Sequence, residues 1–561
     1  ASDVYKRQFI YSSGPIALPK KESRRFSIAL IVGQDYDDLT LNAVTAQDIY
    51  EKDYQFAKPP KKPNVTAVPG DQKVALYWDD IAETSFDPIT ETYDFEGYVI
   101  YRSTDPSFLD QQTITDANGS KFLFEPLKTV DGASAKFDLV NDFSGLSSIP
   151  YSGRGISYNL GDNTGLRHVF VDSNNVINGQ KYYYAVVSYD RGDAELMIAP
   201  VECSKTITVN PETGEVLLDV NTVAVVPRTM TAGYIASTFT DSLPDQIQGS
   251  GTGLINLEII DQTAIQDQND YKIIFSEDDG LNYSVYDEQE VFDTLIARLG
   301  NYHKLSHQNI DSLTFELYNS NGVLLSKGSD YDLFDSDGQI LIHNDGSIND
   351  SEQIVANFLY YPIKNSKKLA LEESNPIFDG IALSVQNDVL ELDEGKIGWN
   401  PGSSTNWVST VKPFNNFGNN KYPADYELRW FNENVSNNYR PGYEYVQANF
   451  EIWETTRGIE PRQLPFIVIE TAPFDSLWNP GERIIILQDS SMSSLSWELT
   501  FDTTDAPIAP VEGDVFSIFT TRAFVDDIFS FSTYSSKEDI IVEKNNMDDI
   551  YVVPNPYVVS S

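Results

Sequence analysis

The run Tyr182-Tyr-Tyr-Ala-Val-Val-Ser-Tyr189 is the clearest strand in the sequence. Successive side chains of a strand point to opposite faces, so Tyr182 and Tyr184 share one side. Two earlier runs, Val74-Ala-Leu-Tyr-Trp78 and Gly97-Tyr-Val-Ile-Tyr101, also place an alternating apolar set on one face. Short alternating runs of β-branched and aromatic residues predict strands, so this region is expected to form a sheet structure.

The order of these runs resembles a fibronectin type III domain, in residues 63–210. That order is a strand ending in Trp, a strand with Gly-Tyr-x-x-Tyr, a long connection and a Tyr-rich strand closed by a Gly turn. In that family the Trp and the first Tyr of the late strand pack the sandwich core, and the Tyr hydroxyl ties a corner. Trp78 and Tyr182 match these positions. The connection from Ser103 to Asn178 is longer than such a domain needs, so we expect an inserted hairpin or lid.

The composition excludes several classes of protein. The 561 residues include 39 Lys and Arg against 84 Asp and Glu, a formal net charge of −45. Nucleic-acid and anionic-lipid binders need clustered basic residues, so both classes are disfavoured. A hydrophobic content of 41% supports several cores, and the length predicts three or four domains. The apolar runs are too short for a membrane helix. The single cysteine, Cys203, forbids an internal disulfide.

The first 62 residues differ from the rest. Ala1 to Gln8 resembles a translated sequencing-adaptor scar, so we leave it out of the fold. In residues 9–62 we expect a buried strand over Phe26 to Val32 and a helix over Asp38 to Phe56, followed by the Pro/Lys-rich spacer Ala57 to Pro63. This helix is the only long one that the sequence predicts.

From residue 219 onward the pattern is strands separated by turns. The Asn-Gly and Asp-Gly pairs at 321–322, 337–338 and 345–346 predict antiparallel hairpins. We expect a β-sandwich region over 219–475, and a further β region over 476–547 that belongs either to the same domain or to another. An apolar stripe also allows a short helix over Glu288 to Leu299. The predicted fold class is therefore all-β: a fibronectin type III-like sandwich, a larger antiparallel sandwich region and one N-terminal helix.

The last segment, 548–561, carries the sequence Val-Pro-Asn-Pro-Tyr at 553–557. This motif resembles the junction that precedes the C-terminal sorting domain of type IX secreted proteins of Gram-negative bacteria. Several other stretches, including Asp94-Phe-Glu-Gly-Tyr98, are similar to the same large surface proteins. The resemblance implies a secreted, cell-surface protein that continues into a sorting domain.

The acidic run Asp330, Asp332, Asp335 and Asp337 is a candidate Ca²⁺ site, because hard oxygen ligands suit this ion. Its spacing does not match an EF-hand loop. The competing interpretation is an acidic hairpin rim, and the sequence favours the rim. Ca²⁺ is the only cofactor that the sequence suggests.

Arg191-Gly-Asp193 closes the Tyr-rich strand, where a fibronectin type III fold places a hairpin loop. A tight exposed loop would present Arg191 and Asp193 to a receptor as an adhesion tripeptide. The alternative is turn chemistry, with Gly192 supplying a positive φ and Asp193 incidental. The turn is the favoured interpretation.

Aromatic side chains are candidates for sugar binding, because rings form platforms for pyranosides. Trp399 and Trp407 lie in a Gly/Pro/Ser/Asn-rich loop and are the two candidate glycan contacts. Trp430, Trp453 and Trp497 lie in strand patterns and are expected to fill cores.

Catalytic motifs give little support to an enzyme. His303 and His307 have the spacing of metal ligands on a helix but lack a third ligand, and a surface loop is favoured. Cys203 follows Glu202, whose charge would raise the thiol pKa, so it is a poor nucleophile. Ser276 to Tyr283 resembles one Asp-box, which predicts a hairpin turn.

The functional expectation is a non-catalytic, secreted or cell-surface structural or adhesive protein. Its partner would be a protein or polysaccharide, with no nucleic acid and no membrane insertion. The alternative is a glycan-binding accessory region of a secreted hydrolase.

Overall fold

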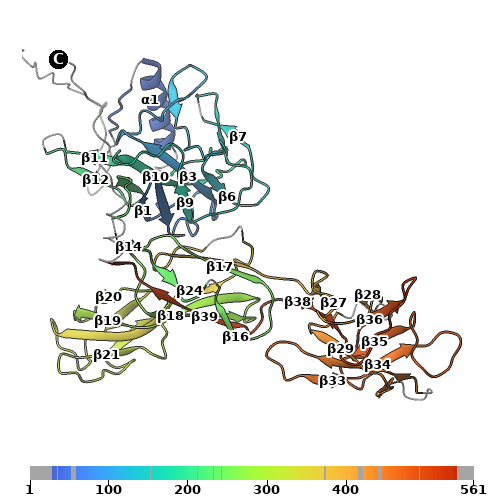
Figure 1. Cartoon of the computed structure of the whole chain (residues 1–561). Helices are drawn as coiled ribbons and strands as arrows, with labels where there is room; N and C mark the ends of the chain where they lie inside the picture. The colour runs from blue at the N-terminus through green and yellow to red at the C-terminus, as the bar shows by residue number, and fades with distance from the viewer. Residues whose placement is uncertain are drawn as a thin grey trace, which may run out of the picture.

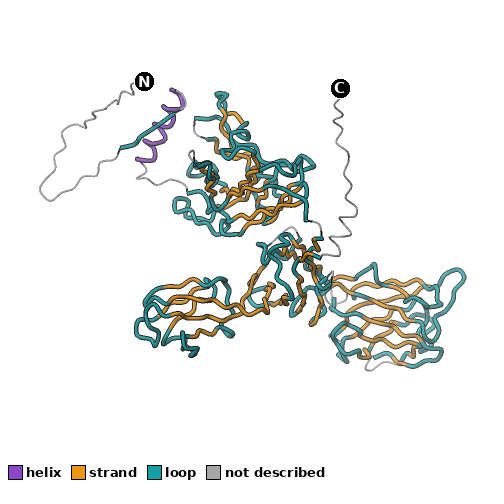
Figure 2. The backbone as a smooth tube through the Cα atoms, turned by 60° about the vertical axis from the view of Figure 1, so that its left-hand side comes forward, coloured by secondary structure: helices purple, strands orange, loops and turns teal. Residues whose placement is uncertain are grey.

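The computed structural model is all-β, with many antiparallel sheets and one short helix, which confirms the predicted fold class (Figures 1 and 2). It describes residues 28–33, 36–51, 58–151, 153–210, 213–231, 233–241, 243–371, 375–414, 421–439, 445–491 and 493–539. The segments Ala1 to Gln8 and 548–561, with their predicted scar and junction, lie outside these residues.

The first sandwich comprises residues 58–227 and two sheets. One sheet has the order β1-β2-β9 and the other β13-β10-β3-β6. Their strands are β1 (Val65–Gly70), β2 (Lys73–Trp78), β9 (Val169–Asp172), β13 (Thr222–Val225), β10 (Tyr182–Asp190), β3 (Phe95–Ser103) and β6 (Lys136–Asp138). Trp78 is 1% exposed in the core between them, and the Tyr182 hydroxyl accepts a hydrogen bond from Ile177 N (3.1 Å). The predicted packing of Trp78 and the corner at Tyr182 are both confirmed.

The long connection contains two inserted hairpins, which confirms the expectation of an insertion. They are β4 (Ile114–Thr115) with β5 (Lys121–Leu123), and β7 (Leu146–Pro150) with β8 (Ser157–Asn159). The connection packs Phe108, Tyr158 and Leu160 on the outer face of β3 and β10, which makes a second core there. For this reason every residue of β10 is buried. A separate hairpin joins β11 (Ile207–Val209) to β12 (Val216–Leu218).

We call the next unit the hub; it is built from the strands given below and lies beneath the first sandwich in Figure 1. Its main sheet has the order β15-β39-β18-β19-β24-β21, with β16 also paired to β39, and a second sheet joins β17 to β25. The strands are β15 (Thr238–Phe239), β16 (Asp245–Gln248), β17 (Leu254–Ile259), β18 (Asn269–Ser276), β19 (Asn282–Ile296), β21 (Glu316–Tyr318), β24 (Gln353–Ser366), β25 (Ile381–Gln386) and β39 (Ile528–Tyr534). The short strands β14 (Tyr234–Ile235) and β40 (Lys537–Glu538) pair beside it.

A side lobe (residues 288–359) forms where β19 and β24 extend beyond the hub. Its second sheet contains β20 (Tyr302–Lys304), β23 (Gln339–Ile342) and β22 (Tyr331–Phe334). The helix considered over Glu288 to Leu299 is wrong, because residues up to Ile296 continue β19 and pair with β24. Cross-strand pairing overrides the helical stripe, and leaves Phe292 and Ile296 exposed while Leu295 packs inward.

The inserted sandwich (residues 391–521) interrupts the hub between β25 and β39. Its sheets have the orders β27-β37-β29-β32-β33 and β28-β36-β35-β34. These strands are β27 (Gly398–Trp399), β37 (Val515–Ile518), β29 (Tyr426–Trp430), β32 (Phe450–Glu454), β33 (Arg462–Leu464), β28 (Val408–Pro413), β36 (Leu495–Asp502), β35 (Arg483–Leu487) and β34 (Phe466–Ile469). The expected division at residue 475 falls inside this unit, because β34 pairs with β35 and one core contains both.

Short pairs complete the described strands. Two of them are β26 (Glu391–Leu392) with β38 (Thr520–Thr521) and β30 (Ser436–Asn437) with β31 (Gln447–Ala448). The predicted turn at 276–283 lies in the hairpin of the hub strands β18 and β19.

The N-terminal predictions are half confirmed. Helix α1 (Tyr36–Glu51) lies within two residues of the predicted start and agrees as far as the described residues reach. Residues 28–33 are irregular, and Ile28, Leu30 and Val32 are exposed, so the predicted buried strand is wrong there. A strand needs a partner, and no described strand pairs with this segment.

Candidate functional site

The junction between the hub and the inserted sandwich contains a hollow with a volume of about 680 Å³. The chain crosses it twice, once after β25 and once after β38. Asn387 and Val389 line the hollow from the first crossing, and Arg522 and Val525 line it from the second. Ser250 of the hub and Pro423 of the inserted sandwich also line it.

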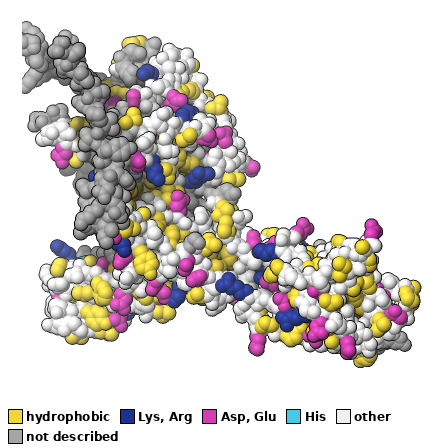
Figure 3. Space-filling view, in the orientation of Figure 1, with side chains coloured by type: hydrophobic (Ala, Val, Ile, Leu, Met, Phe, Trp, Pro, Cys, Tyr) yellow, Lys and Arg dark blue, Asp and Glu magenta, His cyan; other side chains and the backbone are white. Residues whose placement is uncertain are grey.

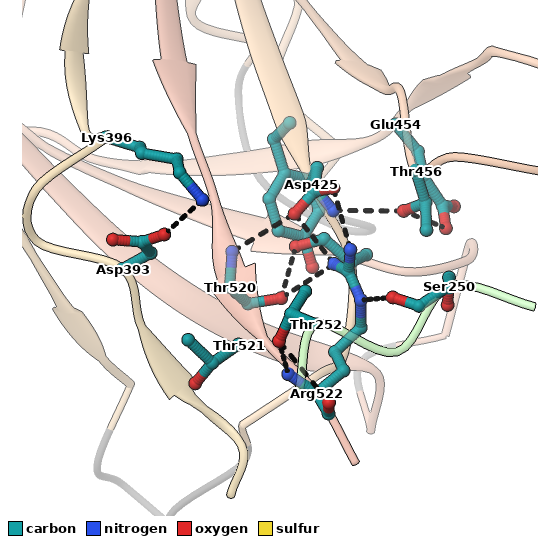
Figure 4. Close-up of polar contacts among 12 residues, drawn as sticks. Ser250, Thr252, Asp393, Lys396, Asp425, Glu454, Thr456, Thr520, Thr521 and Arg522 are labelled. Carbon is teal, nitrogen blue, oxygen red and sulfur yellow. Dashed lines mark hydrogen bonds and ion pairs between the residues drawn. The ribbon is translucent and has the colours of Figure 1, made fainter. Parts of the chain in front are cut away.

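Arg522 follows β38 and is the central polar group of this junction (Figure 4). Its guanidinium donates to both carboxylate oxygens of Asp425, at 2.7 and 2.9 Å, and to Thr520 Oγ1 at 3.0 Å. Its Nε donates to the carbonyl of Ser250, which belongs to the hub, at 2.8 Å. The side chains of Arg522 and Asp425 are only 7% and 10% exposed. A two-pronged Arg–carboxylate pair has fixed geometry as well as charge, so Asp425 orients the guanidinium whose Nε binds the Ser250 carbonyl of the hub.

Further hydrogen bonds reinforce the junction. Thr252 of the hub accepts a hydrogen bond from Arg522 N (2.7 Å) and donates to Asp388 (2.7 Å). Arg457 of the inserted sandwich donates to the side chain and the carbonyl of Gln246, both at 3.0 Å. Because the Arg522 guanidinium makes four hydrogen bonds within the protein, we interpret the site as a structural joint between the two units.

Buried carboxylates gather at the end of the first sandwich nearest residue 190. Burial and the Asp94 charge raise the pKa of Asp190 to about 8, and burial raises those of Asp94 and Glu96 to about 6 and about 7. Asp190 Oδ1 accepts from Gly192 N and Val201 N, whereas its buried Oδ2 has no hydrogen-bond donor among the described residues. The structure therefore favours a protonated Asp190 at neutral pH.

We expect the first sandwich to lose stability as the pH rises from about 4 to about 8, because folded Asp190 holds a proton that the unfolded chain releases near its ordinary pKa. Asp190→Asn keeps Oδ1 as an acceptor and is uncharged. At pH 9 it should raise the Tm by about 2–4 °C, equivalent to about 1 kcal/mol, and flatten the pH dependence. Thermal melts at pH 5, 7 and 9 check this; an unchanged pH slope in the variant contradicts it.

Arg191 and Asp193 make local contacts that stabilise a turn, which is the interpretation that the sequence favours. Arg191 lies over the ring of Phe143, 4.9 Å from its centroid, and donates to the carbonyl of Tyr93 at 3.3 Å. Asp193 Oδ1 accepts from Glu195 N and Leu196 N, both at 2.8 Å. Gly192 has φ of 65°, as the turn interpretation requires. Receptor contact by Arg191 and Asp193 stays a prediction without direct support.

The acidic run over 330–337 is spread over different partners. Asp330 is buried and accepts from Ser326 N and from the Ser347 amide and hydroxyl. Asp332 pairs with His343 at 3.0 Å and Asp335 with Lys364 at 3.6 Å. Asp337 lies in the turn between β22 and β23. In the part of the chain that is described, no group of three His, Cys, Asp or Glu side chains has the arrangement of a metal site.

Trp399 and Trp407 are not exposed platforms, and that expectation is wrong. Trp407 is 9% exposed in the core of the inserted sandwich, and the partly buried Trp399 packs against the same core. The Trp399 indole donates to the carbonyl of Trp407 at 2.9 Å. A core between two sheets is stabilised by large buried aromatic rings, so both rings lie inward although their loop is rich in polar residues.

The remaining candidates have structural partners. His303 lies in β20, and the His307 ring packs against Tyr360 at a tilt, 4.1 Å between centroids, so the two do not share a helix. Cys203 is 3% exposed, and burial raises its thiol pKa, in agreement with a poor nucleophile. It lies outside the named strands, although a strand was expected there.

Sequence reasoning missed both the Arg522 joint and the buried carboxylates. Arg522 and Asp425 are 97 residues apart, and neither belongs to a motif. Asp190 did carry a local signal, because it directly follows the predicted strand Tyr182 to Tyr189, and a charged residue next to such an aromatic and apolar run is seldom fully buried. On the face in Figure 3, acidic side chains are spread over all units and not gathered into one patch.

Among the described residues, no helix has the length and apolar character that crossing a bilayer requires. No protein-family model matches the chain, and no curated protein matches its sequence. A comparison with solved structures matches it to the full-length major pilin RrgB from Streptococcus pneumoniae, at 9% sequence identity and a TM-score of 0.11. This match covers 78% of the chain and 62% of the pilin, so the chain spans less than two thirds of the pilin's length.

Proposed function

We propose that the protein is a non-catalytic structural or adhesive protein, secreted or displayed at the cell surface. The observation that carries the proposal is the structural joint at Arg522. A buried, two-pronged ion pair with Asp425 orients Arg522, which binds Ser250 and Thr252 of the hub, and the chain crosses the same junction twice. Rigid presentation of separate β units suits a protein that displays surfaces to a partner.

The arrangement of the units supports the same role. The side lobe and the inserted sandwich both leave the hub and return to it, so each projects laterally (Figure 1). The hub and the first sandwich then form the central body. Such branching leaves two lateral surfaces free for contact while the hub keeps their spacing.

We assign the first sandwich to a fibronectin type III-like fold, with an added hairpin layer. Support comes from its three-stranded and four-stranded sheets, the buried Trp78 and the tyrosine corner at Tyr182. The proposal of export rests on the resemblance of residues 553–557 to a type IX sorting junction.

Two measurements test this function. Antibodies against the purified chain should label intact, unpermeabilised cells of the bacterium that encodes it; labelling only after permeabilisation overturns the surface location. The purified chain should release no reducing sugar from a panel of polysaccharides. Turnover above the level of a boiled sample overturns the non-catalytic proposal.

A further inference from the structure

A groove of about 310 Å³ lies over the face of the hub sheet where β18, β19 and β24 run side by side. Its floor includes Ile274 and Ser284, and one wall is the loop Ile310 to Leu313. At this point β19 is hydrogen-bonded to β18 on one side and to β24 on the other. Its backbone is therefore occupied, so recognition in the groove depends on side chains and not on an added peptide strand.

An aromatic side chain lines the groove. Tyr361 is half-buried in its wall, and Tyr286 packs against it with 4.8 Å between ring centroids. The Tyr286 hydroxyl donates to Asp311 at 2.9 Å, and the Lys364 ammonium lies 5.6 Å from the Tyr361 centroid. These contacts hold the pair of rings in place before any ligand arrives. A preset ring offers an apolar face at little entropic cost.

Hydrogen-bonding groups line the same groove as this ring. Asp335 and Lys364 face each other across 3.6 Å, and Asn365 N donates to Ser284 Oγ at 2.9 Å. Carboxylates accept, the ammonium donates, and the amide and hydroxyl groups do both. A sugar hydroxyl also donates and accepts, so this mixture next to an aromatic face matches a pyranose ring.

The charge of the groove selects among sugars. Two carboxylates, Asp311 and Asp335, line it against the single ammonium of Lys364, and the chain carries a net charge of −45. An anionic sugar would approach a negative surface, which disfavours its association. A neutral glycan meets no such penalty.

We propose that this groove binds a neutral glycan chain, with Tyr361 as the stacking platform and Asp311, Asp335, Lys364 and Asn365 as hydrogen-bonding partners. The inference deepens the adhesive part of the proposed function and rests on it only for the biological setting. It places glycan contact on the hub, away from Trp399 and Trp407, which fill the core of the inserted sandwich.

The test is affinity electrophoresis of the full chain in gels with hydroxyethyl cellulose, glucomannan, mixed-linkage β-glucan or polygalacturonate. We expect retardation by at least one neutral polysaccharide and none by polygalacturonate. Tyr361→Ala should weaken binding about tenfold, whereas Tyr361→Phe should retain most of it. Tyr445→Ala removes a tyrosine that is 71% exposed on the inserted sandwich, and should bind as the original chain does.

Unchanged migration in all three neutral gels overturns the inference, as does equal retardation of the Tyr361→Ala chain. Asp335→Ala, at a position whose side chain is 43% exposed, keeps the test decisive if Tyr361→Ala fails to fold. It should weaken binding without lowering the Tm, and unaltered binding counts against the groove. Cell labelling and sugar release are measured separately, so failure here is distinct from failure of the proposed function.

Discussion

Arg522→Met is expected to destabilise the inserted sandwich and its junction with the hub by about 3–5 kcal/mol, because removing one partner of a buried ion pair leaves the other charge uncompensated. Asp425 would keep its hydrogen bond from Thr520 N at 3.1 Å but lose both guanidinium contacts. The Ser250 carbonyl would also lose its donor across the junction.

Tryptophan fluorescence during urea denaturation measures this effect. Six of the seven tryptophans lie between residues 399 and 497, so the signal reports mainly on the inserted sandwich. Its unfolding midpoint should fall in the Arg522→Met chain, and proteolysis should begin near the junction. A midpoint unchanged from that of the original chain contradicts the role of Arg522.

Lys396→Met is the matched control. Lys396 pairs with Asp393 at 2.8 Å in the same unit, but its side chain is 66% exposed (Figure 4). A pair in contact with solvent contributes little, so the expected loss is under about 1 kcal/mol. Asp425→Asn in the Arg522→Met background removes the uncompensated buried carboxylate and should recover part of the lost free energy of unfolding. No recovery would mean that lost packing, and not the buried charge, causes the destabilisation.

The sequence was informative where the determinants are local. The Trp78 and Tyr182 framework and the turn at Asp337-Gly338 appear as predicted, since alternation and turn chemistry act over a few residues. The nesting of one sandwich inside the hub was not predictable in this way. It depends on β39 returning to β18 across more than 250 residues, and no local pattern encodes that pairing.

The candidate site also depends on contacts between distant segments, which local sequence patterns do not predict. Trp407 was expected outside because its loop is polar, yet its ring reaches the core from the start of β28. The groove at Tyr361 was missed because it combines four separate segments of chain. Composition indicates that aromatic residues are available, but only the fold determines which of them remain accessible.

Trp430 and Trp453 were both expected to fill cores, and the structure separates them. Trp430 ends β29 and is 1% exposed, with the rings of Phe450 and Trp478 within 5.3 Å between centroids. In β32, Phe450 and Ile452 point inward, so alternation places Trp453 on the outer face. There it lies under the guanidinium of Arg429, 4.7 Å from the ring centroid, and its indole donates to Glu451 at 2.9 Å.

Trp430→Ala should therefore cost about 3–5 kcal/mol, since it opens a cavity among packed rings, whereas Trp453→Ala should cost about 1 kcal/mol or less. Circular dichroism during urea denaturation compares the two without relying on the deleted fluorophores. The Trp430 indole N–H has no hydrogen-bond acceptor among the described residues and lies among aromatic rings. Trp430→Phe consequently removes volume but no hydrogen bond, and should fall between the two. Equal losses for Trp430→Ala and Trp453→Ala would contradict the assignment of faces in β29 and β32, and with it the register that joins these strands.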